Sequence, residues 1–389
     1  MGGASRISRR QLLGLMGTAG GGLALGAGGY LLSRDQEVQA AGRVVPFHGT
    51  HQAGITTRQQ KHAQFAAFDL ETTDRHGLRS LLRRWSGEAA AMTGGADARI
   101  DDPAALTVTI GFGPSMFDDR FGLADDRPHA LIDIPPFEHD QLVVERSLGD
   151  LGVQVCADDK AVALIAMQAM VAAAKGTATV RWAKAGFLRD PLPGEEGGTP
   201  RNLFGFKDGT NNLDPTDDAR MRRNVWVGAA DSPAWMADGT YLVARQIHMD
   251  VVGFLAEPVA EGERAIGRMK ASGAPLGQQH EFDPVIVADQ PVDTHIMVAN
   301  PRRTGSEDER ILRRGYNFSD GFDPEVNQPV GGLLFLCYQR DPRTQFVPIQ
   351  RRLAHGDRLQ HHLFPRGSAI FAVPPGAPAG GYVGETLLG

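Results

Sequence analysis

The chain has 389 residues, 42% hydrophobic and 22% charged, which is typical of a globular protein with a sizeable core. This composition excludes a chain that is mainly disordered, collagen-like or coiled-coil. Forty Lys and Arg against 46 Asp and Glu give a net charge of −6, so no broad basic surface for nucleic acid is expected. Two cysteines, Cys156 and Cys337, are too few for a disulfide framework or a thiolate iron–sulfur site, and both lie in apolar runs typical of buried thiols.

The first 40 residues have the pattern of an export signal. Arg9-Arg10 precede a stretch without charge over residues 11–33, and Val38-Gln39-Ala40 offers a small-x-small cleavage pattern. The pattern resembles a twin-arginine signal, a route associated with export of already folded, often cofactor-loaded proteins. We therefore predict a signal peptide over residues 1–40, recognised by the twin-arginine (Tat) export machinery, and a periplasmic or extracellular protein. A retained membrane anchor is the alternative, because the uncharged stretch is nearly long enough to span a bilayer.

The next part of the chain predicts strands and helices in the order β-α-β-β-α-β, which is the ferredoxin-like pattern. Hydrophobic periodicity and glycine stops predict, in order, a strand within Gln52–Leu70, a helix from Leu78 to Gly94-Gly95, strands at Leu106–Gly111 and Leu151–Cys156, a helix over 158–175 and a strand at Ala178–Trp182.

A segment rich in proline and glycine, residues 191–200, separates this set from a second one. The second set is predicted as a strand at Thr240–His248, a helix over 250–269, strands at His295–Ala299 and Gly332–Tyr338, a helix over 343–359 that Pro348 interrupts, and a last strand at Ala369–Val373. We therefore predict an α+β protein of two ferredoxin-like domains, residues 41–190 and 191–389, with antiparallel sheets in a barrel-like arrangement.

The densest chemical signal is the run from Asn202 to Asn212, where Gly205 and Gly209 bracket Asp208. An Asp-Gly pair alone is typical of a surface turn. Apolar residues precede this one, at Leu203, Phe204 and Phe206. A carboxylate enclosed by such side chains tends to have a raised pKa and can exchange a proton near working pH.

Two further segments carry residues that chemistry could use. His295 stands in an apolar run, where a lone histidine is more often a core residue than a ligand. Arg313 lies among apolar neighbours in the run Arg310–Tyr316, where a permanently charged guanidinium needs an anionic partner. A solvated arginine pair at a loop edge is the alternative for this segment.

Several familiar motifs do not occur in the sequence. It has no G-x-G-x-x-G, Walker, G-x-S-x-G or H-E-x-x-H motif, which argues against nucleotide-binding, hydrolase and zinc-protease functions. His361 and His362, with His355 nearby, suggest a metal site, but a surface helix end is the simpler interpretation.

Together, Asp208, His295 and Arg313 resemble the key residues of the haem peroxidases called dye-decolourising peroxidases. The run Gly205-Phe206-Lys207-Asp208-Gly209 matches the GxxDG motif of that family, and residues 46–55 resemble the start of its mature exported members. The similarity covers residues 44–389. It is strongest to the twin-arginine-exported branch, which includes the deferrochelatase/peroxidase of bacterial iron-uptake systems.

The resemblance implies two ferredoxin-like domains and one haem b, held mainly by the C-terminal domain. It implies that His295 is the proximal ligand of the iron, and that Asp208 and Arg313 act on the distal side. Residues that match haem-lining positions of the family are Gly209, Thr210, Asn211, Asn300, Pro301 and Arg302. Arg302 is expected to pair with a propionate, and Asp341 to accept the second ring N–H of His295. Gly315 stands near the point where other branches have an asparagine.

The function that the resemblance implies is a haem peroxidase that reduces hydrogen peroxide and oxidises dyes or other bulky or phenolic reductants in one-electron steps. A deferrochelatase or haem-handling protein that releases iron from haem is the first alternative, and a non-enzymatic exported binding protein is the second. The sequence does not identify the electron donor, and it leaves open a homo-oligomer and contacts with iron-uptake proteins. Candidates to carry electrons from a bulky donor are Trp182, Trp226, Trp235, Tyr316 and Tyr338.

Overall fold

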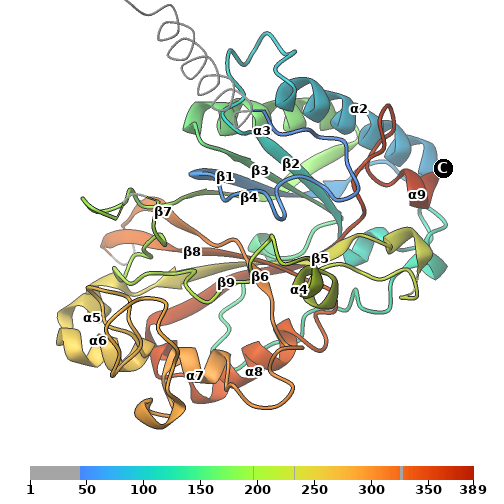
Figure 1. The fold of residues 1–389 in the computed structure, drawn as a ribbon. Helices are drawn as coiled ribbons and strands as arrows, with labels where there is room; N and C mark the ends of the chain where they lie inside the picture. The colour runs from blue at the N-terminus through green and yellow to red at the C-terminus, as the bar shows by residue number, and fades with distance from the viewer. Residues whose placement is uncertain (1–43, 196, 232, 325–326) are drawn as a thin grey trace, which may run out of the picture. The chain divides into compact units, whose positions relative to one another are not determined.

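Antiparallel strands form the central sheet of the protein (Figure 1). In the residues that the structure describes, the strands are β1 (His62–Leu70), β2 (Thr107–Phe112), β3 (Leu151–Ala157), β4 (Ala178–Phe187), β5 (Thr240–Met249), β6 (Leu312–Arg313), β7 (Tyr316–Asp323), β8 (Gln328–Gln339) and β9 (Leu363–Val373). The order across the sheet is β5-β9-β2-β3-β1-β4-β7-β8-β6, and β5 also pairs with β8, so the sheet closes into a barrel.

The computed structural model describes residues 44–195, 197–231, 233–324 and 327–389, of which Val44–Gly389 form one unit. The predicted signal peptide, residues 1–40, lies outside the described residues. No helix within the described ranges is long and apolar enough to cross a membrane.

The barrel consists of two halves with the same strand order. The first half is β2-β3-β1-β4 and the second is β7-β8-β5-β9, so strands of corresponding rank occupy corresponding places. The halves meet where β4 pairs with β7 through Phe187 and Asn317, and where β2 pairs with β9 through Phe112 and Ala372. This arrangement confirms the predicted α+β class and the duplicated ferredoxin-like pattern, while the boundary between residues 190 and 191 stays a prediction.

Two helices cover the first half: the amphipathic α2 (Arg75–Thr93) and the largely apolar α3 (Lys160–Ala174). Asp74 caps α2 by accepting the Gly77 N–H at 2.8 Å, and Gly94 ends the helix. The apolar side chains spaced three and four residues apart in α2 are all buried: Leu78, Leu81, Leu82, Trp85, Ala89 and Met92. Figure 1 shows α2 and α3 side by side over the strands of the first half, as the periodicity predicts.

The second half carries shorter helices: α4 (Asp218–Asn224), α5 (Val251–Ala256), α6 (Val259–Ile266), α7 (His295–Ala299) and α8 (Phe346–Gly356). The C-terminal helix α9 (Glu385–Leu388) instead lies against α2, whose Arg75 and Arg79 donate to its carbonyls. Pro258 separates α5 from α6, because proline disfavours a helical residue before it, so the single helix predicted over 250–269 is wrong. Pro348 lies in the first turn of α8, where no backbone N–H is needed.

The predicted strand at His295–Ala299 is wrong, because these residues form the helix α7. A short apolar run fits a strand and a buried helical turn equally well, and here the Thr294 carbonyl accepts the N–H groups of Met297 and Val298, both at 3.0 Å. The strand that fills this place in the second half is β7, whose sequence YNFSDGFD alternates too weakly to be recognised.

Apolar side chains fill the barrel. One cluster includes Phe65, Trp182, Phe318 and Phe371, which come from β1, β4, β7 and β9. Both cysteines are free and buried, as predicted.

Candidate active site

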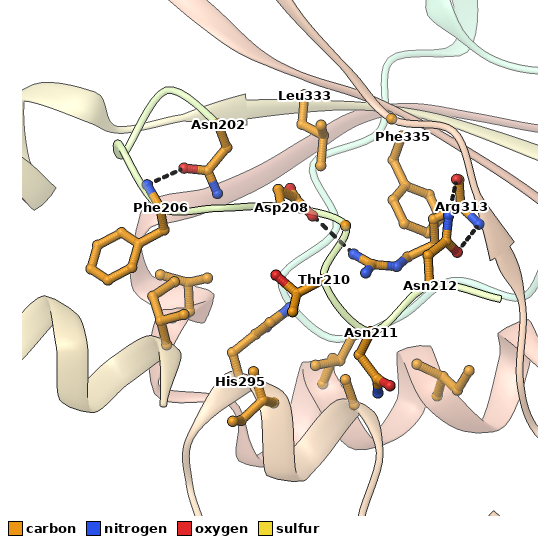
Figure 2. A pocket seen from close by; sticks show the side chains of 18 of the residues that line it. Asn202, Phe206, Asp208, Thr210, Asn211, Asn212, His295, Arg313, Leu333 and Phe335 are labelled. Atoms are coloured by element: carbon orange, nitrogen blue, oxygen red, sulfur yellow. Dashed lines mark hydrogen bonds and ion pairs between the residues drawn. The ribbon is translucent and has the colours of Figure 1, made fainter. Parts of the chain in front are cut away.

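A cavity lies between the strands of the second half and the helices α7 and α8. Its apolar walls are formed by Ile247 and Met249 of β5, Leu333 and Phe335 of β8, Ile296 and Ala299 of α7, and Ile349 and Leu353 of α8. Figure 2 shows the polar side chains that point into this cavity from opposite sides.

Asp208 and Arg313, which are 105 residues apart, meet in the cavity as an ion pair with 2.9 Å between Oδ1 and Nη1 (Figure 2). The backbone N–H of Asp208 donates to the Pro200 carbonyl at 2.8 Å. Gly209 follows with a φ of +135°, a conformation that favours glycine. The two charged side chains are 31% and 30% exposed, so both can reach a ligand in the cavity.

The structure corrects the expected surroundings of Asp208 and confirms the expected partner of Arg313. Asp208 is not enclosed by its apolar neighbours, because Phe204 and Phe206 pack into a separate cluster with Met249 and Phe254. Arg313 has the anionic partner that its environment required. The alternative of a solvated arginine pair is wrong, because Arg314 is 4% exposed and donates to Gln60.

Asn212 holds Arg313 in place, a role that the sequence did not predict. Its Oδ1 accepts the Arg313 N–H at 2.9 Å, and its Nδ2 donates to the Arg313 carbonyl at 2.8 Å. The side-chain amide thereby imitates a strand partner for β6. Its place in the Asp208 run was visible in the sequence, but its contact over 101 residues was not.

His295 is the first residue of α7, and Figure 2 shows its imidazole pointing into the cavity. Its Nδ1 lies 2.7 Å from Oδ2 of Asp357, whose carboxylate is 1% exposed. Asp357 is itself fixed, because its Oδ1 accepts the Leu359 N–H at 3.0 Å. Burial alone would lower the pKa of His295, but the Asp357 carboxylate outweighs it and raises that pKa.

Asp341 was predicted to be the partner of His295, and this is wrong. Asp341 instead forms an ion pair with Arg343, 2.7 Å from its Nη2. An arginine two residues away reaches the carboxylate locally, whereas Asp357 follows α8, the helix that packs against α7. Only the packing of these two helices shows which carboxylate meets His295.

Several arginines give the cavity a positive charge. Arg268, Arg302 and Arg310 all line it. Arg302 donates to the carbonyls of Ile296 and Asn300, at 2.9 and 2.7 Å. Burial lowers the pKa of Arg302, and the nearby charges of Arg268 and Arg310 lower it further. Cations this close favour an anionic ligand.

The cavity brings together nearly all residues predicted for the site. Its lining includes Asp208, Gly209, Thr210, Asn211, His295, Asn300, Arg302 and Arg313. Pro301 does not line it, although both of its neighbours do.

These residues fit a haem. An imidazole oriented by a carboxylate is a common axial ligand of haem iron, and its Nε2 is not used by Asp357. The apolar walls suit a porphyrin, and the guanidinium groups suit its two propionates. Among the described residues, no group of three or more His, Cys, Asp or Glu could hold a bare metal ion. His355, His361 and His362 therefore form no such group. Nε2 of His362 instead lies 3.1 Å from Oε1 of Glu257.

Comparisons with known proteins identify the family. Two family models match the chain: Dyp-type peroxidase, N-terminal, over residues 52–188, and Dyp-type peroxidase, C-terminal, over residues 199–378. The deferrochelatase of Escherichia coli K12 is 36% identical over 421 aligned positions, which cover 99% of this chain and 98% of that protein.

Solved structures agree with this relationship. DtpA from Streptomyces lividans, in an oxyferrous/water mixed complex, has 39% identity and a TM-score of 0.84 over 90% of this chain and 99% of that chain. A DyP-type peroxidase from Cellulomonas bogoriensis has 38% identity and a TM-score of 0.82, with 90% and 99% covered.

Fold and site together define a haem-binding α+β enzyme. The chain belongs to the Dyp-type peroxidase family. Haem is its cofactor, and hydrogen peroxide and a reductant are its substrates. The family resemblance, the cofactor and the peroxidase class predicted from the sequence are therefore confirmed.

Proposed function

We propose that His295 binds the haem iron through Nε2 and that Asp208 and Arg313 act on peroxide at the opposite face. The observation that carries this proposal is the 2.9 Å ion pair of Asp208 and Arg313, in the same cavity as an imidazole anchored by Asp357. Gly209, Thr210, Asn211, Asn300 and Pro301 are assigned to the haem surroundings, and Arg302, with Arg268 and Arg310, to the propionates.

When bound, the haem would supply the redox chemistry that reduces peroxide. Asp208 would take a proton from one oxygen of peroxide and deliver it to the other. Arg313 would stabilise the negative charge that develops on the departing oxygen, because a fixed cation needs no reorganisation in a partly dry cavity. Its ion pair also orients the Asp208 carboxylate. Asp357 orients the imidazole of His295 and strengthens it as an electron donor.

Rapid mixing with peroxide tests these roles. Haem-loaded Asp208→Asn and Arg313→Leu should each react with peroxide about 10²–10³-fold more slowly, with the haem still bound. Asp214→Asn, an exposed carboxylate that bonds to Thr216, is the control and should react like the parent. If the two distal variants keep the parent rate, the proposed roles are wrong.

The reductants proposed for this site are dyes or other bulky or phenolic molecules, oxidised in one-electron steps. Their electrons would cross protein, since the aromatic candidates Trp182, Trp226, Trp235, Tyr316 and Tyr338 are all at least nine-tenths buried. Trp226 stacks on the His51 ring at 3.6 Å.

A second candidate function is release of iron from haem. The 36% identity with proteins named deferrochelatase over nearly the whole chain favours it. Incubating the haem-loaded protein with a ferrous chelator and a reductant, without peroxide, separates the two functions. Metal-free porphyrin fluorescence would support iron release, whereas an unchanged haem spectrum would argue against iron release and leave peroxidase activity as the function.

We also propose export by the twin-arginine route, to the periplasm or beyond, with the Tat machinery as a transient partner. Arg9-Arg10 and the uncharged stretch after them support this proposal. Replacing both arginines with lysines should retain the protein in the cytoplasmic fraction. For the exported protein we further propose a homo-oligomer and contacts with iron-uptake proteins. Size-exclusion chromatography of the purified protein tests the homo-oligomer.

A further inference from the structure

Glu281 lies beside the segment that carries Asp208, which we call the distal loop (residues 199–212). Its carboxylate is 10% exposed and contacts three side chains of this loop. Oε2 lies 2.7 Å from Nζ of Lys207, while Oε1 accepts the hydroxyls of Thr210, at 2.9 Å, and of Thr199. Lys207 directly precedes Asp208 and Thr210 follows two residues later, so one carboxylate holds the loop on both sides of Asp208.

Glu281 is itself held firmly. Nη1 of Arg268 donates to the Glu281 carbonyl at 2.9 Å and to the Gly273 carbonyl at 2.6 Å. Gly273 packs closely against the ion pair, since a Cβ there would lie 2.8 Å from Cδ of Lys207 and 3.3 Å from Cγ of Glu281. The carboxylate is therefore a fixed point outside the loop.

The contact with Lys207 requires a charged carboxylate. The Lys207 side chain is 11% exposed, and an ammonium group buried this far needs an anion nearby. The other carboxylate near it, Glu195, is farther away, at 3.8 Å. Burial would raise the pKa of Glu281, but the hydrogen bonds from Lys207, Thr199 and Thr210 lower it, so the group is ionised at neutral pH.

Other contacts hold the two ends of the distal loop, since Arg201 donates to the Lys270 and Ala271 carbonyls and Asn212 is bonded to Arg313. Nearer to Asp208, its backbone N–H bonds to Pro200 of the same loop, and the flanking Lys207 and Thr210 are joined to a segment outside the loop by Glu281. Movement of the loop would therefore carry the carboxylate away from its place beside Arg313. A displacement of about 1 Å in a reacting group can cost about 10²-fold in rate.

We propose that Glu281 is a positioning residue that sets the place of the Asp208 carboxylate through Lys207, Thr210 and Thr199. The proposal rests on the proposed proton-transfer role of Asp208. Glu281 itself does not line the cavity. Its contribution is to the rate of the peroxide reaction and not to haem binding.

A double-mutant cycle in the haem-loaded protein tests this proposal. Glu281→Gln should lower the second-order rate constant for peroxide about tenfold, with haem content and the visible spectrum unchanged. In an Asp208→Asn background the same substitution should change the rate less than about twofold, because no placed acid remains. Asp150→Asn is the matched control: Asp150 is 8% exposed and pairs with Arg120 in the first half, so its loss affects folding but not the peroxide rate.

The possible results separate the proposals. A parent rate for Glu281→Gln, an equal loss in the Asp208→Asn background, or an equal loss in Asp150→Asn would each overturn the role of Glu281. A parent rate for Asp208→Asn would instead overturn the proposed function on which it rests. If Glu281→Gln does not fold, Thr199→Val removes one hydrogen bond from the same carboxylate and should slow the reaction about threefold. An unchanged rate there would also overturn the proposal.

Discussion

The two halves of the barrel share one strand order, yet the cavity lies in the second half. In the first half, α2 packs directly on the sheet, and Leu78, Leu82 and Trp85 are fully buried. In the second half, the first and second strands, β5 and β7, are connected by residues 250–315, a longer segment than the 71–106 of the first half. This segment contains α5, α6, α7 and the short strand β6, and it leaves a space instead of filling it. The chemistry therefore depends on an expanded connection and not on the fold as such.

The cavity also differs from the first half in how buried charge is balanced. In the first half, Arg120 and Asp150 form a complementary ion pair at 3.1 Å. In the cavity of the second half, Arg302 donates to backbone carbonyls and lies near two more arginines. An unbalanced positive charge of this kind favours an anionic ligand, the place that the proposed function gives to the haem propionates.

The largest expected effect is a loss of haem binding in the second half, with the first half unaffected. His295→Ala should lower haem affinity by more than about 100-fold, because the iron would lose its proposed protein ligand. Titration with haem, followed at the Soret band, measures this loss. Denaturant unfolding of the haem-free protein should show a decrease in stability from the lost contact with the buried Asp357 carboxylate, and Asp357→Asn provides the comparison for this contribution. Parent-like haem affinity would remove His295 from the proposed role.

The second prediction concerns the two carboxylates assigned to His295 by sequence and by structure. Asp357→Asn should lower haem affinity or peroxide turnover about 10–100-fold, because a neutral amide orients the imidazole less firmly and donates less charge. Asp341→Asn is the control, since its carboxylate pairs with Arg343. Equal effects of the two variants would contradict the assignment of Asp357.

These variants mark the limits of the sequence analysis. Periodicity was sufficient for α2, whose buried side chains lie three or four residues apart, and a short apolar run was sufficient for β3, whose residues are all buried. The motif around Asp208 and the positions of His295 and Arg313 came from family resemblance. The roles of Asp357, Asn212 and Glu281 could not be found in this way, because each residue acts through a contact with a distant segment. Asp357 is 62 residues from His295, Asn212 is 101 residues from Arg313, and Glu281 is 71 and 82 residues from Thr210 and Thr199. A local pattern carries no information on such contacts.

A matched pair of substitutions sharpens the comparison of the two helical layers. Leu82→Ala, in the filled layer of the first half, should destabilise the protein by about 2–5 kcal/mol, with or without haem. Leu353→Ala, on the cavity wall, should cost less in the haem-free protein, because that side chain packs on one side only. Its cost should rise when haem is bound. Denaturant unfolding with and without haem measures the loss of stability in each variant. Equal losses for Leu82→Ala and Leu353→Ala in the haem-free protein would show that Leu353 is already fully packed without haem.

The smallest expected effect compares histidines on the corresponding strands β1 and β5. Burial and the nearby Arg146 lower the pKa of His248 to about 4, whereas burial and Lys160 lower the pKa of His62. Between the ordinary histidine pKa of about 6.5 and 4, the unfolded chain binds a proton that the folded chain does not. Stability therefore falls as the pH decreases through this range.

His248→Gln should remove about 1–2 kcal/mol of that decrease, less than the full pKa shift implies, because the ring is partly exposed and screened by solvent. His62→Gln should remove less, since its ring is less enclosed. Chemical unfolding at pH 7, 5.5 and 4.5 measures these differences. A steeper pH dependence in His248→Gln than in the parent would contradict this prediction, because it would mean that folding favours the protonated ring. An anion would then have to lie nearer to His248 than Arg146, whose Nη1 is 3.2 Å from Nε2 of the ring.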